Sequence, residues 1–225
     1  MKSIMFFVLS FTILTFGKQD GIEIPAIFSD NMVLQQNTDV SFWGKAEPGS
    51  NVSIEASWGE SANTTVNDDH SWLIKIKTPE AGGPYDVNLQ VGDSTINYKN
   101  VLIGEVWLCS GQSNMEMPLQ GWLPESPIDN SKEVIEKSDY PQIRLFTVQR
   151  AFSNKEEFNC MGKWEECSPT TSPAFSATAF FFGRKLYEEL KIPIGLIHSS
   201  WGGTPVESWT SRKYLESIDD FKSIL

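Results

Sequence analysis

Residues 101–115 read VLIGEVWLCSGQSNM, and this stretch decides the fold. Up to Cys109 it is apolar apart from Gly104 and Glu105, and it lacks the strict alternation of apolar and polar residues that marks a strand with one face in water. A run of this kind is typical of a parallel strand buried on both faces. It leads directly into the polar residues 110–115, so we expect a central strand that ends in a polar loop.

Two more apolar runs follow, at residues 143–148 and 194–197. A helical pattern precedes each of them, at residues 130–137 and 175–190. The predicted core face of the second helix holds Ala179, Phe182, Leu186 and Leu190. Strands that alternate with helices predict an α/β fold with a parallel sheet and right-handed crossovers. Since such sheets usually have about five strands or more, we expect residues 101–225 to be the amino-terminal part of a larger domain.

The segment before this sheet, residues 22–100, has a different pattern. Apolar residues alternate with polar ones, as in residues 72–76 and 85–91, and turn residues such as Pro48-Gly49 separate the runs. Short strands with one apolar face predict a small antiparallel β-sandwich. We expect this sandwich to be independent of the α/β sheet, with the boundary at residues 100–101.

Charge and cysteine content restrict the possible partners and crosslinks. The net charge is −11, and the lysine and arginine residues form no basic stripe. Because binding to a phosphate backbone needs clustered positive charge, we expect no nucleic-acid partner. The 3 cysteines allow at most one intramolecular disulfide. Cys160 and Cys167 are the candidate pair, and the alternative is three free, buried thiols.

The first residues have the order of a signal peptide. Lys2 supplies a positive charge, residues 4–16 are almost wholly apolar, and Thr15 and Gly17 are small enough for a cleavage site. The apolar run is shorter than the ~20 residues that a membrane-spanning helix needs. We therefore expect residues 1–18 to be a cleaved signal peptide, and the mature protein to be secreted or periplasmic with no membrane attachment.

Polar loops follow the first and third apolar runs. In open α/β sheets, reacting groups gather at the carboxyl ends of the strands, and the first loop places Ser113 there. A serine at a sharp turn exposes its hydroxyl and leaves its N–H free for an oxyanion. The second loop, residues 198–209, contains Gly202-Gly203, whose N–H groups can approach a ligand closely. Together the two loops predict a reactive site at one edge of the sheet.

Longer stretches around these loops resemble the sialate O-acetylesterase family, a branch of the SGNH (GDSL-like) serine esterases. The resemblance rests on residues 104–115, GEVWLCSGQSNM, and on residues 200–209, SWGGTPVESW. Residues 28–36, FSDNMVLQQ, also resemble the amino-terminal β-domain of secreted bacterial members. The resemblance implies an SGNH-type parallel sheet preceded by a β-sandwich. It also implies hydrolysis of acetyl esters on a sugar or glycan substrate, without a metal or an organic cofactor.

The resemblance further implies roles for single residues. Ser113 matches the family nucleophile, whose backbone N–H also contributes to the oxyanion hole. Gly202 and Gly203 match the glycines that supply a second donor, and we favour Gly203. The remaining residues expected in the oxyanion hole or in contact with substrate are Gln112, Asn114 and Thr204.

The sequence departs from the family pattern at the general base. The family's Gln-Gly-Glu block and its base-bearing Asp-x-His-Pro block do not occur, and His198 is the sole histidine after Ser113. We expect His198 to be a strand-end residue and not the base. The sequence is therefore interpreted as a carboxyl-terminally truncated bacterial member that has little activity alone. Two alternatives stay open: an acetylxylan-type esterase and a non-catalytic carbohydrate-binding fragment.

Overall fold

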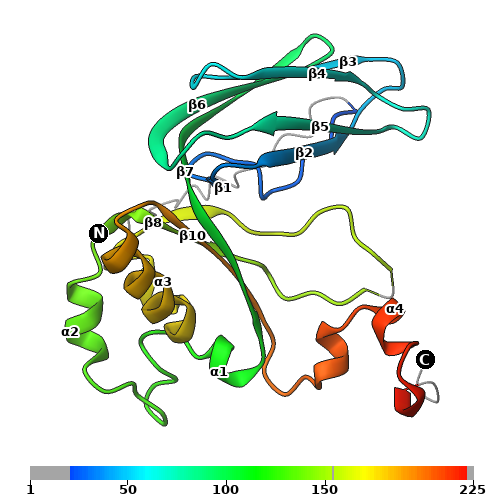
Figure 1. The fold of residues 1–225 in the computed structure, drawn as a ribbon. Coiled ribbons are helices and arrows are strands. Elements are labelled where there is room, and N and C mark those ends of the chain that lie inside the picture. The colour runs from blue at the N-terminus through cyan, green and yellow to red at the C-terminus, as the bar shows by residue number, and fades with distance from the viewer. Residues whose placement is uncertain (1–20, 154, 222–225) are drawn as a thin grey trace, which may run out of the picture.

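The computed structural model describes residues 21–153 and 155–221, so the predicted signal peptide lies outside the described residues. A two-layer β-sandwich lies above the rest of the molecule in Figure 1. One layer is the antiparallel pair of β2 (Asp39–Lys45) and β5 (Ser71–Lys77). The other layer contains β3 (Asn51–Ala56), β4 (Ser61–Thr65), β6 (Gly82–Val91) and the first part of β7 (Ser94–Gly111). The short strand β1 (Val33–Gln35) pairs in parallel with β7.

Alternate residues of the sandwich strands face a single core. On β5, Trp72, Ile74 and Ile76 are at most 3% exposed, whereas Leu73 between them is 54% exposed. Each such buried side chain contributes roughly 1.5–3 kcal/mol relative to leaving it in water. The alternation in the sequence thus reports the two faces of each layer, and the predicted antiparallel β-sandwich is confirmed.

Strand β7 joins the two parts of the molecule. Its residues 94–103 pair with β6 in the sandwich, and its residues 105–111 pair with β10 (Ile194–Ser200) below it. The boundary predicted at residues 100–101 lies inside this strand. The expectation that the sandwich would be independent of the α/β sheet is therefore wrong. The sequence pattern changes there because β7 leaves the sandwich, not because the strand ends.

The second part of the molecule is the predicted α/β sheet. Strand β10 lies between β7 and β8 (Tyr140–Thr147) and runs parallel to both, which confirms the parallel sheet. Strand β9 (Trp164–Cys167) is antiparallel to β8. The helices are α1 (Ser113–Glu116), α2 (Ser131–Glu136), α3 (Ala177–Leu190) and α4 (Arg212–Leu215). The 3-10 turns are η1 (Ser172–Ala174), η2 (Val206–Trp209) and η3 (Asp219–Phe221).

Helix α3 packs on the sheet with only part of the predicted face, since Ala179 is buried and Leu186 packs against the core as expected. Phe182 and Leu190, both expected in the core, are 40% and 48% exposed, whereas Phe180 is fully buried. The reason is Gly183, where a Cβ atom would lie only 2.5 Å from a methyl carbon of Leu196 on β10. Glycine at this position lets the helix approach the strand closely, and the helix turns that side toward the sheet.

All three cysteines are free thiols. Cys167 lies in the core between the sheet and α3, whereas Cys160 packs against the sandwich core. The candidate Cys160–Cys167 disulfide is therefore wrong, because the two thiols belong to different cores. Burial raises the pKa of Cys109 to about 11 and the pKa of Cys167 to about 12, so both remain protonated at neutral pH.

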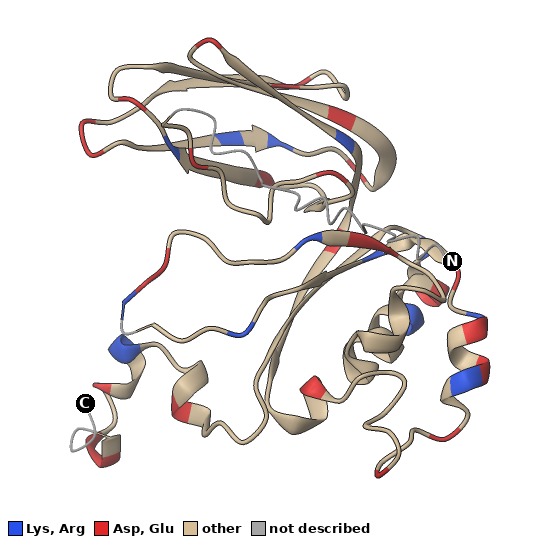
Figure 2. Cartoon of the chain, turned by 180° about the vertical axis from the view of Figure 1, so that it is seen from behind, with Lys and Arg blue, Asp and Glu red and all other residues tan. Residues whose placement is uncertain are grey.

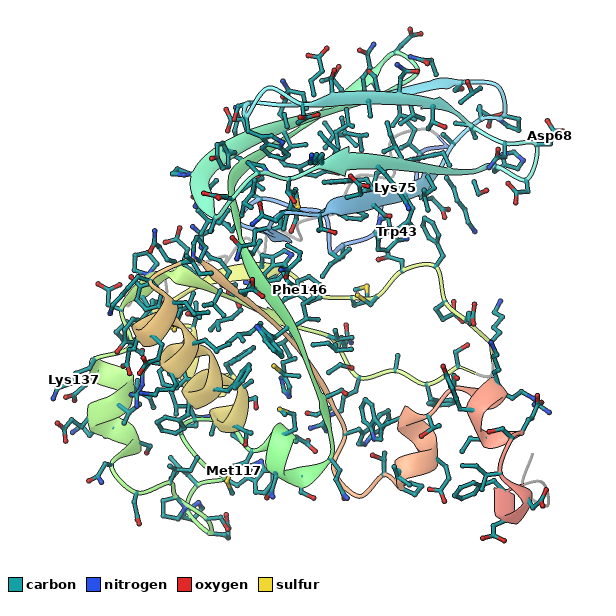
Figure 3. All side chains as sticks on the ribbon, in the orientation of Figure 1. Trp43, Asp68, Lys75, Met117, Lys137 and Phe146 are labelled. Carbon is teal, nitrogen blue, oxygen red and sulfur yellow. The ribbon has the colours of Figure 1, made fainter. Side chains whose placement is uncertain are left out.

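Arg144 on β8 ties the sheet to the sandwich. Its side chain is 3% exposed, and its Nε donates to Pro141 O at 2.8 Å. Nη1 donates to Asn31 O at 3.2 Å, before β1, and Nη2 donates to Asn100 Oδ1 at 3.1 Å, in the sandwich part of β7. Burial lowers the pKa of Arg144, and the charge of Glu166 partly offsets this. The nearby ring of Phe146, labelled in Figure 3, belongs to the sandwich core although it lies on β8.

The surface carries mixed charge. Figure 2 shows lysine and arginine residues scattered among aspartate and glutamate over both parts of the described chain. Within residues 21–153 and 155–221, no helix is long and apolar enough to cross a membrane.

Candidate active site

The two loops predicted to carry the chemistry meet at one edge of the sheet. Strands β7 and β10 are in register, with His198 opposite Cys109 and Ser200 opposite Gly111. The N–H of Trp201 donates to Gly111 O at 3.0 Å as the strands end. Figure 1 shows both strands reaching the lower edge of the molecule beside α1. The residues that follow them are therefore neighbours.

Ser113 is the first residue of the short helix α1. The chain turns at Gly111, whose φ of +145° is in a region that favours glycine. The Glu116 N–H donates to Gln112 O and the Met117 N–H to Ser113 O, each at 2.9 Å. Ser113 itself is exposed, and its N–H has no acceptor among the described residues because it opens the helix. It thus presents both a hydroxyl and a free N–H.

Gln112 and Asn114 flank Ser113, and both are exposed. The carbonyl of Asn114 accepts a hydrogen bond from the Thr178 hydroxyl at 2.8 Å, which ties the turn to the start of α3. Neither amide side chain hydrogen-bonds to the part of the chain that the structure describes. Both amides can therefore donate to a ligand at this turn.

The two glycines after β10 have different surroundings. A Cβ at Gly202 would lie 2.5 Å from Glu116 Oε2 and 3.8 Å from Ser113 Cα, so this glycine packs against the turn that holds Ser113. Its N–H donates to the Glu116 carboxylate. Gly203 has a φ of +79° and faces open space, and its N–H has no acceptor among the described residues. Of the two N–H groups, that of Gly203 is the one open to a ligand.

Thr204 orders the loop that presents these glycines. Its hydroxyl donates to Trp201 O at 2.7 Å and accepts from Trp209 Nε1 at 2.8 Å. Because its single proton is used within the loop, Thr204 has no side-chain donor left for an oxyanion. These two bonds order the loop around Gly203, and the expected contact of Thr204 with substrate or an oxyanion stays a prediction.

Two charged residues that the sequence analysis missed connect the loops. The carboxylate of Glu116, with only 13% of the side chain exposed, binds both the Gly202 N–H and the guanidinium of Arg150. Glu116 comes three residues after Ser113, a spacing that places both on one side of a helix. That spacing was a usable signal for Glu116. Arg150 follows β8, far away in sequence, and no local pattern indicates its contact with α1.

His198, the one downstream histidine, bonds to a different serine. Its Nε2 is 2.6 Å from Ser200 Oγ, and both residues are buried. The ring also meets the Phe175 ring edge-on, with centroids 5.5 Å apart. Burial lowers the pKa of His198 below 6.5; an interaction with the Met115 backbone partly offsets this, and the charge of Arg150 adds to it. No hydrogen bond links it to Ser113 in the described chain.

A cavity of about 360 Å³ opens beside Glu116, at the carboxyl ends of β8 and β10. Its walls combine charged, amide and aromatic side chains, among them Glu116, Arg150, Gln120, Gln149 and Trp122. The volume lies within the range of roughly 300–1,000 Å³ that is usual for small-ligand sites. In the described part of the chain, no three His, Cys, Asp or Glu side chains group in a way that could hold a metal ion.

Curated proteins with sequences similar to this chain are sialate O-acetylesterases. No family model matches the chain. The sialate O-acetylesterase of Mus musculus is 33% identical over 219 residues, which cover 88% of this chain and 39% of the mouse protein. That of Homo sapiens is 32% identical over 215 residues, which cover 88% of this chain and 40% of the human protein. The chain therefore spans about two fifths of the length of these relatives.

A solved structure is similar as well. The crystal structure of a carbohydrate acetylesterase from Xanthomonas citri matches with a TM-score of 0.79 and 26% sequence identity. The match covers 89% of this chain and 45% of that protein.

Proposed function

Because the chain belongs to the sialate O-acetylesterase family over the part of those proteins that it spans, we propose that it carries the nucleophile half of a carbohydrate O-acetylesterase site. The observation that supports this most is the meeting of two loops at one sheet edge. There Ser113 exposes a hydroxyl and a free N–H, and Gly203 exposes a second free N–H. A serine beside two such donors suits acyl transfer.

The proposed reaction has two steps. The Ser113 Oγ attacks the carbonyl carbon of the acetyl ester and gives its proton to a general base, while the N–H groups of Ser113 and Gly203 bind the resulting oxyanion. The intermediate collapses when the bond to the sugar oxygen breaks, and the base returns its proton to that oxygen. Water then attacks the acetyl-serine and releases acetate, and Ser113 regains its proton.

The general base is proposed to come from outside the described residues. His198 is occupied by Ser200, and its depressed pKa makes it a weak base. A serine hydroxyl is a poor nucleophile unless a base lies within roughly 3 Å of it in the reactive complex. We therefore expect these 225 residues alone to release acetate at a small fraction of the rate of a protein in which such a base is present.

An O-acetylated sialic acid is the proposed substrate, and the protein is proposed to meet it outside the cytoplasm after loss of residues 1–18. The relatives' printed names support the sialate. The mixed polar and aromatic cavity beside Glu116 has room for one sugar unit. An acetylxylan-type substrate is the second candidate, because the loops at Ser113 and Gly203 contact the acetyl group and do not distinguish the sugars.

Acetate release tests the proposal. The gene-encoded protein that contains these residues is incubated with O-acetylated sialic acid and, separately, with acetylated xylan. Ser113→Ala should lower the rate at least about 1,000-fold, as loss of a catalytic serine does. Ser110→Ala is the matched control, because Ser110 is exposed near the end of β7, three residues before Ser113, and makes no side-chain hydrogen bond to the described residues. Full activity in Ser113→Ala, or a wild type that binds the sugars without releasing acetate, would contradict it.

A further inference from the structure

Glu116 makes contacts that the reaction above does not use. It is the last residue of α1, the helix that Ser113 opens. One of its carboxylate oxygens, Oε2, accepts the Gly202 N–H, and the other, Oε1, pairs with Arg150. The side chain is mostly buried, whereas Arg150 is half-exposed at the cavity wall. A single carboxylate therefore connects α1, the loop after β10 and the segment after β8.

The Glu116 carboxylate determines which of the two glycine N–H groups can bind a ligand. The Gly202 N–H is taken by Glu116, and the next N–H along the loop, that of Gly203, is free. Without an acceptor at Glu116, Gly202 would lose the contact that holds it beside Ser113 Cα. Gly203 has a positive φ and, as a glycine, no Cβ, so no side chain of its own fixes the path of the loop. The orientation of the second oxyanion donor thus depends on the carboxylate next to it.

We propose that Glu116 is a positioning residue of the esterase site. It anchors Gly202 to the nucleophile helix and, held by Arg150, keeps the Gly203 N–H directed at the oxygen of the acetyl group. This role rests on the proposed function, since positioning a donor matters only if an oxyanion forms. Glu116 itself touches neither the reacting carbonyl nor the serine proton.

The first test is kinetic and uses the gene-encoded protein. Glu116→Ala should lower kcat about 100-fold, which is the usual loss on removing one oxyanion donor. KM should change less than about threefold, because the donor acts mainly on the transition state. Glu116→Gln keeps an acceptor for the Gly202 N–H and should recover most of the lost kcat. Glu136→Ala, at an exposed glutamate of α2, is the matched control and should leave both constants unchanged.

The second test needs no activity. In the ¹⁵N-labelled chain, the Gly202 amide should exchange with solvent at least about tenfold faster in Glu116→Ala than in wild type, because it loses its hydrogen bond. Glu136→Ala should not change the exchange. Unchanged Gly202 exchange in Glu116→Ala would overturn the positioning role, whatever the activity. If Glu116→Ala failed to fold, Glu116→Gln and Arg150→Met would be measured in its place, with Arg150→Met expected to accelerate the same amide.

The two tests separate the inference from the proposed function. An active wild type whose kcat is unaffected by Glu116→Ala would overturn the positioning role and leave the esterase intact. A wild type that releases no acetate, but whose Gly202 protection depends on Glu116, would overturn the proposed function. A parallel rise in KM and loss of thermal stability, with kcat unchanged, would identify Glu116 as a structural residue only and also overturn the inference.

Discussion

The residues of the site differ in how far the sequence predicts them. Ser113 and the two glycines follow buried strands, so position in the chain alone was enough to place them at the sheet edge. Thr204 is expected in the oxyanion hole or in contact with substrate, and its hydroxyl donates to Trp201 O within its own loop, a contact that only the loop conformation determines. The contact between Glu116 and Arg150 joins segments that are distant in sequence, and no local pattern encodes it.

His198 should contribute to the pH dependence of stability. Burial lowers its pKa in the folded state below the ordinary value of 6.5. As the pH falls through 6.5, the unfolded chain takes up a proton at this histidine, whereas the folded chain does not. The free energy of unfolding therefore falls, and the contribution is lost as the pH drops through the folded-state pKa.

The measurement is urea unfolding of wild type and of His198→Gln, which keeps a hydrogen-bonding partner for Ser200 but does not titrate. Wild type should lose more stability than His198→Gln between about pH 7 and about pH 5. His70→Asn, at an exposed histidine with positive φ, is the control and should behave as wild type does. If the free energy of unfolding changed equally with pH in wild type and in His198→Gln, burial would not lower the pKa of His198.

The positions of the strands could be predicted from the sequence, but the packing between elements could be predicted only in part. The period-two pattern located β5 and β6, and the apolar runs located β8 and β10. The face of α3 was predicted only in part, because hydrophobicity favours Phe182 for the core, whereas the helix approaches Leu196 most closely at Gly183. Steric fit between two elements is a property of both and does not show in either sequence alone.

The contact between β7 and the start of β10 also depends on a glycine. A Cβ at Gly104 would lie 2.0 Å from Pro193 O and 2.7 Å from Pro193 C, which are backbone atoms and cannot turn away. Gly104→Ala should therefore destabilise the fold by about 3 kcal/mol, at the upper end of overpacking costs. The measurement is chemical denaturation.

The control for this variant is Gly49→Ala, where φ is +79° and nothing lies within 4 Å. It should cost only about 1 kcal/mol, from the unfavourable left-handed backbone alone. The same loss in both variants would mean that Gly104 is not closely packed against Pro193.

At the scale of the whole molecule, β7 makes the sandwich and the α/β sheet parts of one structure. The strand runs without a break from its pairing with β6 to its pairing with β10. A boundary was predicted there because the residue pattern changes, but a change of environment along one strand leaves the same signature as a change of domain. We expect the two parts to unfold in a single transition.

Arg144 should contribute strongly to that cooperativity. Its buried guanidinium binds Asn31 and Asn100 across the junction, and Met in its place would leave those acceptors without donors. Arg144→Met should lower the free energy of unfolding by about 3 kcal/mol, as expected on breaking a buried charged network. Calorimetry measures this. Lys137→Met, at an exposed ion pair with Glu133 at the end of α2, should leave the free energy of unfolding nearly unchanged. Two separate unfolding transitions in wild type would show that β7 does not make the sandwich and the α/β sheet unfold together.

The most direct test of Ser113 as the nucleophile is to identify the residue that carries the acetyl group during turnover. The gene-encoded protein is mixed with an O-acetylated sugar, quenched in acid within a turnover, digested and analysed by mass spectrometry. We predict one acetyl group on Ser113 in wild type and in Ser110→Ala, and none in Ser113→Ala. An acetyl group on another residue, such as the buried Ser200 beside His198, or turnover that continues in Ser113→Ala, would contradict it.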